Sequence, residues 1–114
     1  MAEGVNPDLK AVHSQLVAMV AELEAAIGQA KTSAQVNAIL DEIIEVNARV
    51  TVAGRQLFTR QTEEISEAAS HVAKAVDETK EAIRRLEGIT ELIQTVTKFL
   101  GLVDKVIATA KLVI

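Results

Sequence analysis

Apolar residues recur every three or four positions along most of the chain, which is the spacing of one face of an α-helix. The pattern divides into three regions, 7–31, 32–87 and 89–114, separated by a short polar run and by Gly88. It predicts an all-α fold, in which three or four amphipathic helices form an antiparallel helical bundle or a coiled-coil-like arrangement.

The first predicted helix covers residues 7–31. Asn6 can accept a hydrogen bond from an unpaired amide of the first turn, Pro7 occupies the first helical position, and Asp8 faces the positive end of the helix dipole. Residues 1–5 are expected to form a flexible lead-in. The second helix is predicted from residue 33, because Thr32 and Gln35 have the spacing of a capping box. The short connection between them predicts that the two helices are antiparallel.

A polar patch interrupts the middle region at residues 59–64, where six consecutive residues lack an apolar side chain. The apolar stripe resumes at Ile65, eight residues after Leu57. If the patch is a loop, the chain has four helices of similar length, at about 7–31, 33–58, 62–87 and 90–113. If the patch is helical, residues 33–87 form one long helix that needs a partner chain. The patch has no Gly, Pro or Asn to stop a helix, so both arrangements stay open at this point.

The last predicted helix, 90–113, follows Gly88, with Thr90 as a candidate N-terminal cap. It carries a broad apolar face with lysines on the opposite side. A face of this width suits either a packed core or contact with another molecule.

Composition narrows the classes of protein that fit. A chain of 114 residues predicts a single domain, 1–114, without disulfides because it has no cysteine. A net charge of −4 and only two aromatic residues argue against a nucleic-acid partner. The first residues do not resemble a secretion signal, and no run reaches the ~18 apolar residues of a membrane span. We therefore expect a cytoplasmic protein.

The side chains that usually carry chemistry are scattered. Neither His13 nor His71 has the glutamate three residues earlier that helical metal sites use. Several acids are paired with bases at a spacing of four, such as Glu45 with Arg49, which is typical of a solvated helix face. No catalytic residue, metal site or cofactor site is predicted, and the chain is not expected to be an enzyme.

The remaining hypothesis is a non-enzymatic helical interaction or structural module. We expect it to form a homo-oligomer, most simply a dimer, or to pack against a helical protein through apolar helix faces. The residues expected to carry association are Leu57, Phe58, Phe99, Leu102, Val106 and Leu112. The alternative is an amphipathic protein that lies on a lipid or membrane surface through its C-terminal helix, 90–114. That alternative is less favoured because the helix has no tryptophan and only a weak positive charge.

Overall fold

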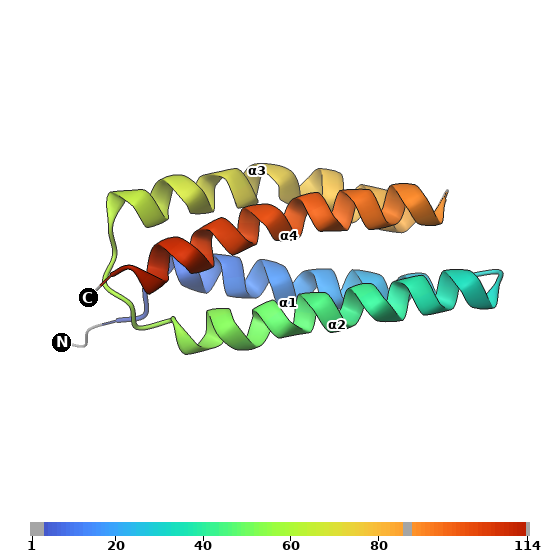
Figure 1. Ribbon diagram of the computed structural model, residues 1–114, viewed down its shortest axis with the longest axis horizontal. Helices are drawn as coiled ribbons and strands as arrows, with labels where there is room; N and C mark the ends of the chain where they lie inside the picture. The colour runs from blue at the N-terminus through green and yellow to red at the C-terminus, as the bar shows by residue number, and fades with distance from the viewer. Residues whose placement is uncertain (1–3, 86–87, 114) are drawn as a thin grey trace.

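Four helices pack together in the computed structural model, which describes residues 4–85 and 88–113 (Figure 1). They are α1 (Pro7–Ile27), α2 (Ser33–Arg55), α3 (Glu63–Arg85) and α4 (Ile89–Lys111). No strand occurs within those ranges, so the predicted all-α fold is confirmed. Three predicted features reach beyond the described residues: the start of the lead-in at residues 1–3, the end of the third helix at residues 86–87, and residue 114.

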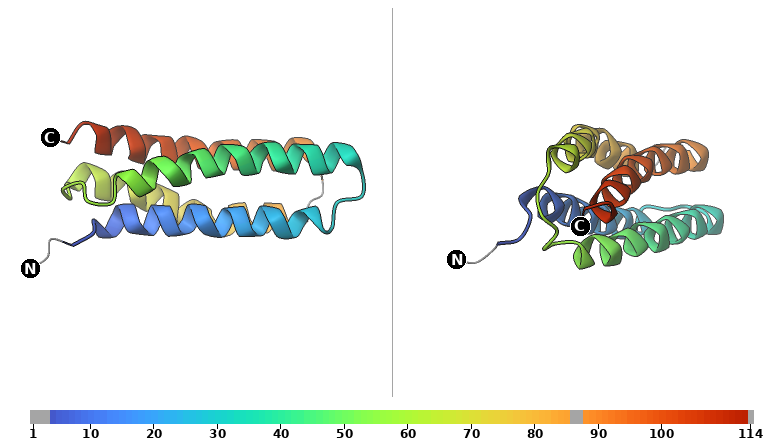
Figure 2. Two further views of the ribbon diagram at one scale, coloured as in Figure 1. Left: turned by 90° about the horizontal axis from the view of Figure 1, so that it is seen from below. Right: turned by 60° about the vertical axis from the view of Figure 1, so that its left-hand side comes forward.

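The helices form two layers, with α1 beside α2 and α3 beside α4 (Figures 1 and 2). Consecutive helices run in opposite directions along a molecule that measures 50 × 20 × 19 Å. Between the layers, α1 packs mainly on α3 and α2 mainly on α4, and each of these pairs runs in the same direction. The chain must therefore cross the end of the molecule diagonally to pass from α2 to α3.

This diagonal crossing is made by residues 56–62, which include most of the polar patch. The alternative of one continuous helix through the patch is therefore wrong. The crossing begins with a turn in which the Thr59 amide donates to the Gln56 carbonyl at 2.9 Å. It ends at Thr62, whose hydroxyl oxygen accepts a hydrogen bond from the Ile65 amide at 3.2 Å. Thr62 thus caps α3, and Glu63 and Glu64 face the positive end of its dipole.

Asn6 ties the crossing to the start of α1. Its side-chain oxygen accepts from the amides of Asp8 at 3.0 Å and Leu9 at 3.1 Å, so the predicted cap is confirmed. Its side-chain nitrogen donates to the Thr59 carbonyl at 3.0 Å and to Gln61 Oε1 at 3.2 Å. The Asn6 amide also donates to the Leu57 carbonyl at 2.7 Å. Asn6 is only 4% exposed, and these bonds, which we call the Asn6 network, use its side-chain oxygen, its side-chain nitrogen and its backbone amide.

The first two helices end earlier than the periodicity suggests. α1 stops at Ile27, four residues before the predicted end, with Gly28 as its C-terminal cap. α2 stops at Arg55, because the chain turns at once into the crossing. The predicted cap at Thr32 is confirmed by a 3.1 Å bond from the Gln35 amide to the Thr32 hydroxyl oxygen. The Gln35 side chain reaches back to the amide of Lys31, one residue before the cap.

The last helix begins at Ile89, with Gly88 in the capping position and no side-chain hydrogen bond at the cap. Thr90 lies inside the first turn, so the prediction that it caps α4 is wrong. The helix ends at Lys111, close to the predicted end.

The core lies between the two layers and follows one face of each helix. On α1 it contains Leu9, Leu16 and Leu23, which are fully buried. Burial of each such side chain stabilises the fold by about 1.5–3 kcal/mol. On α2 the buried positions include Val46 and the acid Glu42, whereas Ile43 is only half-buried.

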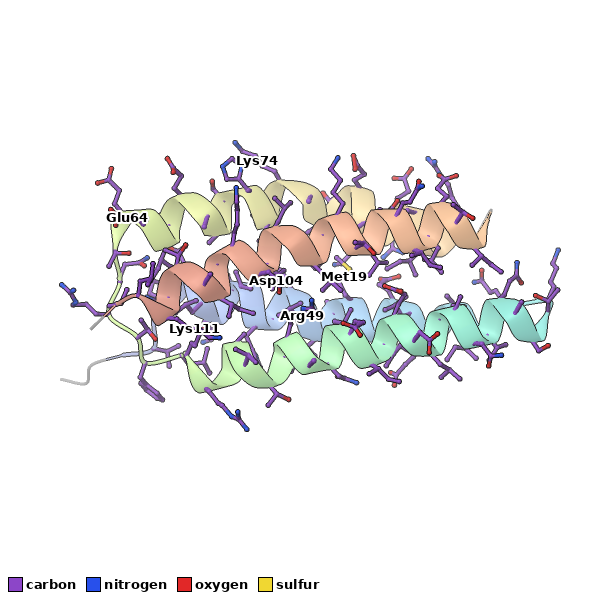
Figure 3. All side chains as sticks on the ribbon, viewed as in Figure 1. Met19, Arg49, Glu64, Lys74, Asp104 and Lys111 are labelled. Carbon is purple, nitrogen blue, oxygen red and sulfur yellow. The ribbon has the colours of Figure 1, made fainter. Side chains whose placement is uncertain are left out.

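Two arginine–carboxylate pairs join the layers, one across each pair of parallel helices. Arg49 of α2 donates to Asp104 of α4 through Nε at 3.0 Å and Nη2 at 3.1 Å (Figure 3). Arg84 of α3 donates to Glu22 of α1 through Nε at 3.0 Å and Nη2 at 2.7 Å. The Arg84 hydrogen bond lowers the pKa of Glu22. Such two-point pairing fixes the relative position of the helices more strictly than a single contact.

The Asn6 network can be tested by substitution. Asn6→Ala should lower the free energy of unfolding by about 2–4 kcal/mol, because it removes a helix cap and leaves the Thr59 carbonyl without its donor. Asn6→Asp keeps the capping oxygen but loses the donor, so we expect a smaller loss of about 1–2 kcal/mol. Urea denaturation measures both values.

Thr32→Ala is the matched control, because Thr32 caps α2 through the local bond to Gln35. It should cost about 1 kcal/mol. If Asn6→Ala costs no more than Thr32→Ala, the bonds from Asn6 to the crossing contribute nothing to stability.

Candidate interaction surface

Three of the six residues predicted to carry association lie at the end of the molecule where the chain crosses. Phe58 is 77% exposed within the crossing, and Leu112 is 81% exposed just after α4. Leu57 is half-buried, and its carbonyl accepts the bond from Asn6. Val113 is half-buried and packs against the core. We call Leu57, Phe58, Leu112 and Val113 the loop-end surface.

A shallow groove adjoins this surface. It has a volume of about 450 Å³ and runs between the end of the crossing and the end of α4. It is lined by Arg60, Thr62, Glu64, Thr109, Leu112 and Val113. The groove places two apolar side chains beside one base and one acid, which suits contact with a mixed protein surface better than with a small apolar ligand.

The other three predicted residues lie within α4. Phe99 and Val106 are 1% and 0% exposed, and both belong to the core. Leu102 is half-buried and packs against the core. α4 contacts both α2 and α3, so its broad apolar face covers two neighbours at once. Phe99 and Val106 therefore belong to the core of this chain.

A second apolar surface was not predicted from the sequence. On the outer side of the layer formed by α1 and α2, Val17, Leu40 and Ile44 are 48%, 44% and 64% exposed. We call this outer side the α1–α2 face, and it is turned toward the viewer in the left panel of Figure 2. The half-buried side chains beside them are Val20, Ile43 and Val50. Among the helical residues that the structure describes, most of the large exposed apolar side chains lie on this surface.

The sequence does carry a signal for this surface. Val17 follows Leu16, Leu40 follows Ile39, and Ile44 follows Ile43. Each pair places an apolar side chain about 100° around the helix from a neighbour that points inward. On α1 and α2 the first member of each pair is buried or half-buried, and the second is exposed. The periodicity identifies the inward face, and these second members identify the face that α1 and α2 leave uncovered.

The buried carboxylate of Glu42 is the most unusual polar group in the described part of the core. It lines a groove of about 270 Å³ between α2 and α4, beside the Arg49–Asp104 pair. Burial raises the pKa of Glu42, and the nearby charges of Glu45 and Asp41 raise it further. Arg49 opposes this effect but is bonded to Asp104 and Glu45. The groove therefore holds a destabilised acid next to an arginine whose charge is already paired.

The two histidines lie on different helices. The imidazole of His13 packs against Gly54, where an added Cβ atom would lie 3.5 Å from His13 Nε2. His71 is exposed on α3. Among the residues that the structure describes, no group of three or more histidine, cysteine or acidic side chains could hold a metal ion. Over the same residues, none of the helices combines the length and the apolar character needed to cross a membrane.

Comparisons with known proteins complete this description. No protein-family model matches the chain, and neither a curated protein nor a solved structure matches it. The four-helix fold, the loop-end surface and the α1–α2 face are therefore the observations on which a function must be argued.

The unfavourable burial of Glu42 predicts that Glu42→Gln stabilises the fold at pH 7. Because the pKa is raised in the folded state, the ionised carboxylate destabilises the protein above its ordinary pKa of 4.5, and this effect disappears as the pH falls. The variant should therefore have a higher urea midpoint than the native chain at pH 7 and nearly the same midpoint at about pH 4.

Glu67→Gln, at an exposed position of α3, is the control and should leave the midpoint almost unchanged at both pH values. A gain at Glu42 that is equally large at acidic pH would contradict the role given to its charge.

Proposed function

We propose that this chain is a non-enzymatic helical interaction module that self-associates, or packs with a helical protein, through apolar side chains its own core leaves uncovered. The observation that carries the proposal is the grouping of exposed apolar side chains. Of the six large ones among residues 4–85 and 88–113, three lie on the α1–α2 face and two on the loop-end surface. Single exposed apolar residues are ordinary, whereas grouped ones are typical of interaction sites.

The two phenylalanines illustrate the difference between core and surface. Phe99 is buried among the helices, while Phe58 stands on a short crossing that the Asn6 network holds in place. An aromatic side chain on a fixed backbone can be buried by a partner with little loss of conformational freedom. Burial of Phe58 and Leu112 by a partner would contribute about 1.5–3 kcal/mol for each side chain.

The lipid-surface alternative requires a different state of the protein. The apolar face of α4 includes Leu92, Val96 and Val103, which are buried in the core. To lie on a membrane, α4 would have to leave the other three helices and expose the core of the whole fold. The proposal of a protein partner needs no such opening, so we favour it. Sedimentation with vesicles of neutral and anionic lipid distinguishes the two, since only the alternative gives bound protein.

The proposal predicts that the native chain has a mass greater than one subunit by light scattering at micromolar concentration. The double variant Phe58→Ser, Leu112→Ser should lower the association constant by about tenfold or more if the loop-end surface takes part, because two exposed apolar side chains no longer become buried. Ile93→Ser is the control, since Ile93 is an exposed large apolar residue on α4 that belongs to neither surface.

A native chain that stays monomeric at all accessible concentrations would remove the self-association form of the proposal. If the chain associates and the double variant behaves like the Ile93 control, the loop-end surface is not part of the contact.

A further inference from the structure

Charged residues are placed regularly on the α1–α2 face. Along α1, Lys10, Val17 and Glu24 follow one another at intervals of seven residues, and all three are exposed. Residues seven apart on an α-helix lie on nearly the same line. This line therefore has a base at one end, an exposed apolar side chain in the middle and an acid at the other end.

α2 repeats the arrangement in the opposite chain direction. Asp41, Ala48 and Arg55 are also exposed and spaced by seven residues. Their line follows the outer edge of the same face, and the exposed Leu40 and Ile44 lie between it and α1 by helical geometry. On α2 the acid comes first and the base last.

The antiparallel packing of α1 and α2 brings like charges to the same end. Gly54 of α2 lies against the imidazole of His13 of α1, because a side-chain carbon added at Gly54 would lie 3.5 Å from His13 Nε2. This contact shows which residues of the two helices are level with each other. Counting from it at 1.5 Å per residue, Arg55 is level with the end that carries Lys10, and Asp41 is within about 3 Å of the level of Glu24. The face therefore has a positive end and a negative end about 20 Å apart, with the apolar residues between them.

We propose that the α1–α2 face binds a second copy of the chain, with the two copies antiparallel and related by a two-fold axis close to Val17. Lys10 of each copy then lies opposite Glu24 of the other, and Arg55 lies opposite Asp41. Val17 meets its own equivalent at the axis. This inference rests on the proposed self-association and assigns it a surface and an orientation.

The charge pattern favours a second copy over an unrelated partner because the face complements itself. The antiparallel orientation pairs every charged end with its opposite, whereas the parallel orientation would place like charges together, so the charges select one orientation. The uncharged centre supplies the apolar contact. A face that follows the 50 Å length and 20 Å width of the molecule is large enough for the ~800 Å² per partner of a stable interface.

Charge reversal tests this geometry. Lys10→Glu and Glu24→Lys should each weaken self-association by about tenfold or more, because each places like charges opposite one another twice in the dimer. The double variant Lys10→Glu, Glu24→Lys should recover the native association constant. An equimolar mixture of the two single variants should form a heterodimer more readily than either variant forms a homodimer. Sedimentation velocity measures all four cases.

Cysteine cross-linking tests the position of the axis. The native chain has no cysteine, so every disulfide can be assigned to the introduced residue. Val17→Cys should form a disulfide between two copies under mild oxidation and give a covalent dimer on a denaturing gel. Ala73→Cys, at an exposed position on α3, is the control and should stay mostly unlinked. Circular dichroism verifies that the variants fold.

The outcomes separate this inference from the proposed function. If the native chain associates but the charge variants do not weaken it and their mixture shows no preference, the interface lies elsewhere and only the inference is overturned. If Val17→Cys links no faster than Ala73→Cys, the axis does not pass near Val17 and the inference is overturned in the same way. A native chain that is monomeric throughout overturns both the inference and the self-association on which it rests.

Discussion

The diagonal crossing between α2 and α3 decides which helices are neighbours, and Asn6 holds it in place. The side chain of Asn6 caps α1 with its oxygen and binds the crossing with its nitrogen. The backbone amide of Asn6 donates to the Leu57 carbonyl. The start of α1 and the middle of the chain are thereby fixed relative to each other. A connection that followed the edge of the molecule would place α3 beside α2. The diagonal path instead places α3 beside α1 and α4 beside α2, so each helix has one antiparallel and one parallel neighbour.

Parallel neighbours have an electrostatic cost. Each helix end carries the equivalent of about half a charge, and parallel packing brings like ends together. The Arg84–Glu22 and Arg49–Asp104 pairs join these parallel helices and fix their register. Two neighbours for each helix also require a wide inward face. The width explains why Phe99 and Val106 are both buried on α4, and why Glu42 is drawn into the core on α2.

Local signals in the sequence predicted the helices, whereas the contacts between them could not be read from it. The caps at Asn6 and Thr32 act through neighbouring residues, so their positions follow from residue type and spacing. The loop at the polar patch also has a local signal, because Thr62 followed by two acids is a pattern typical of a helix start. The roles of Phe99 and Val106 depend on how many neighbours α4 has, and periodicity carries no information on that number. For the same reason, the position of the α1–α2 face depends on which sides of α1 and α2 are covered by α3 and α4.

Both ends of the described chain lie at the end of the molecule where the crossing is, as Figure 1 shows. A short linker could therefore join residue 113 to residue 4 without spanning the 50 Å length of the fold. The connection between α1 and α2 lies at the opposite end, and its exposed residues around Gly28 make few contacts that a cut would break. A circularly permuted chain that begins at α2 and ends with α1 would keep the same neighbours, because helix order in space is set by the crossing and not by where the chain starts.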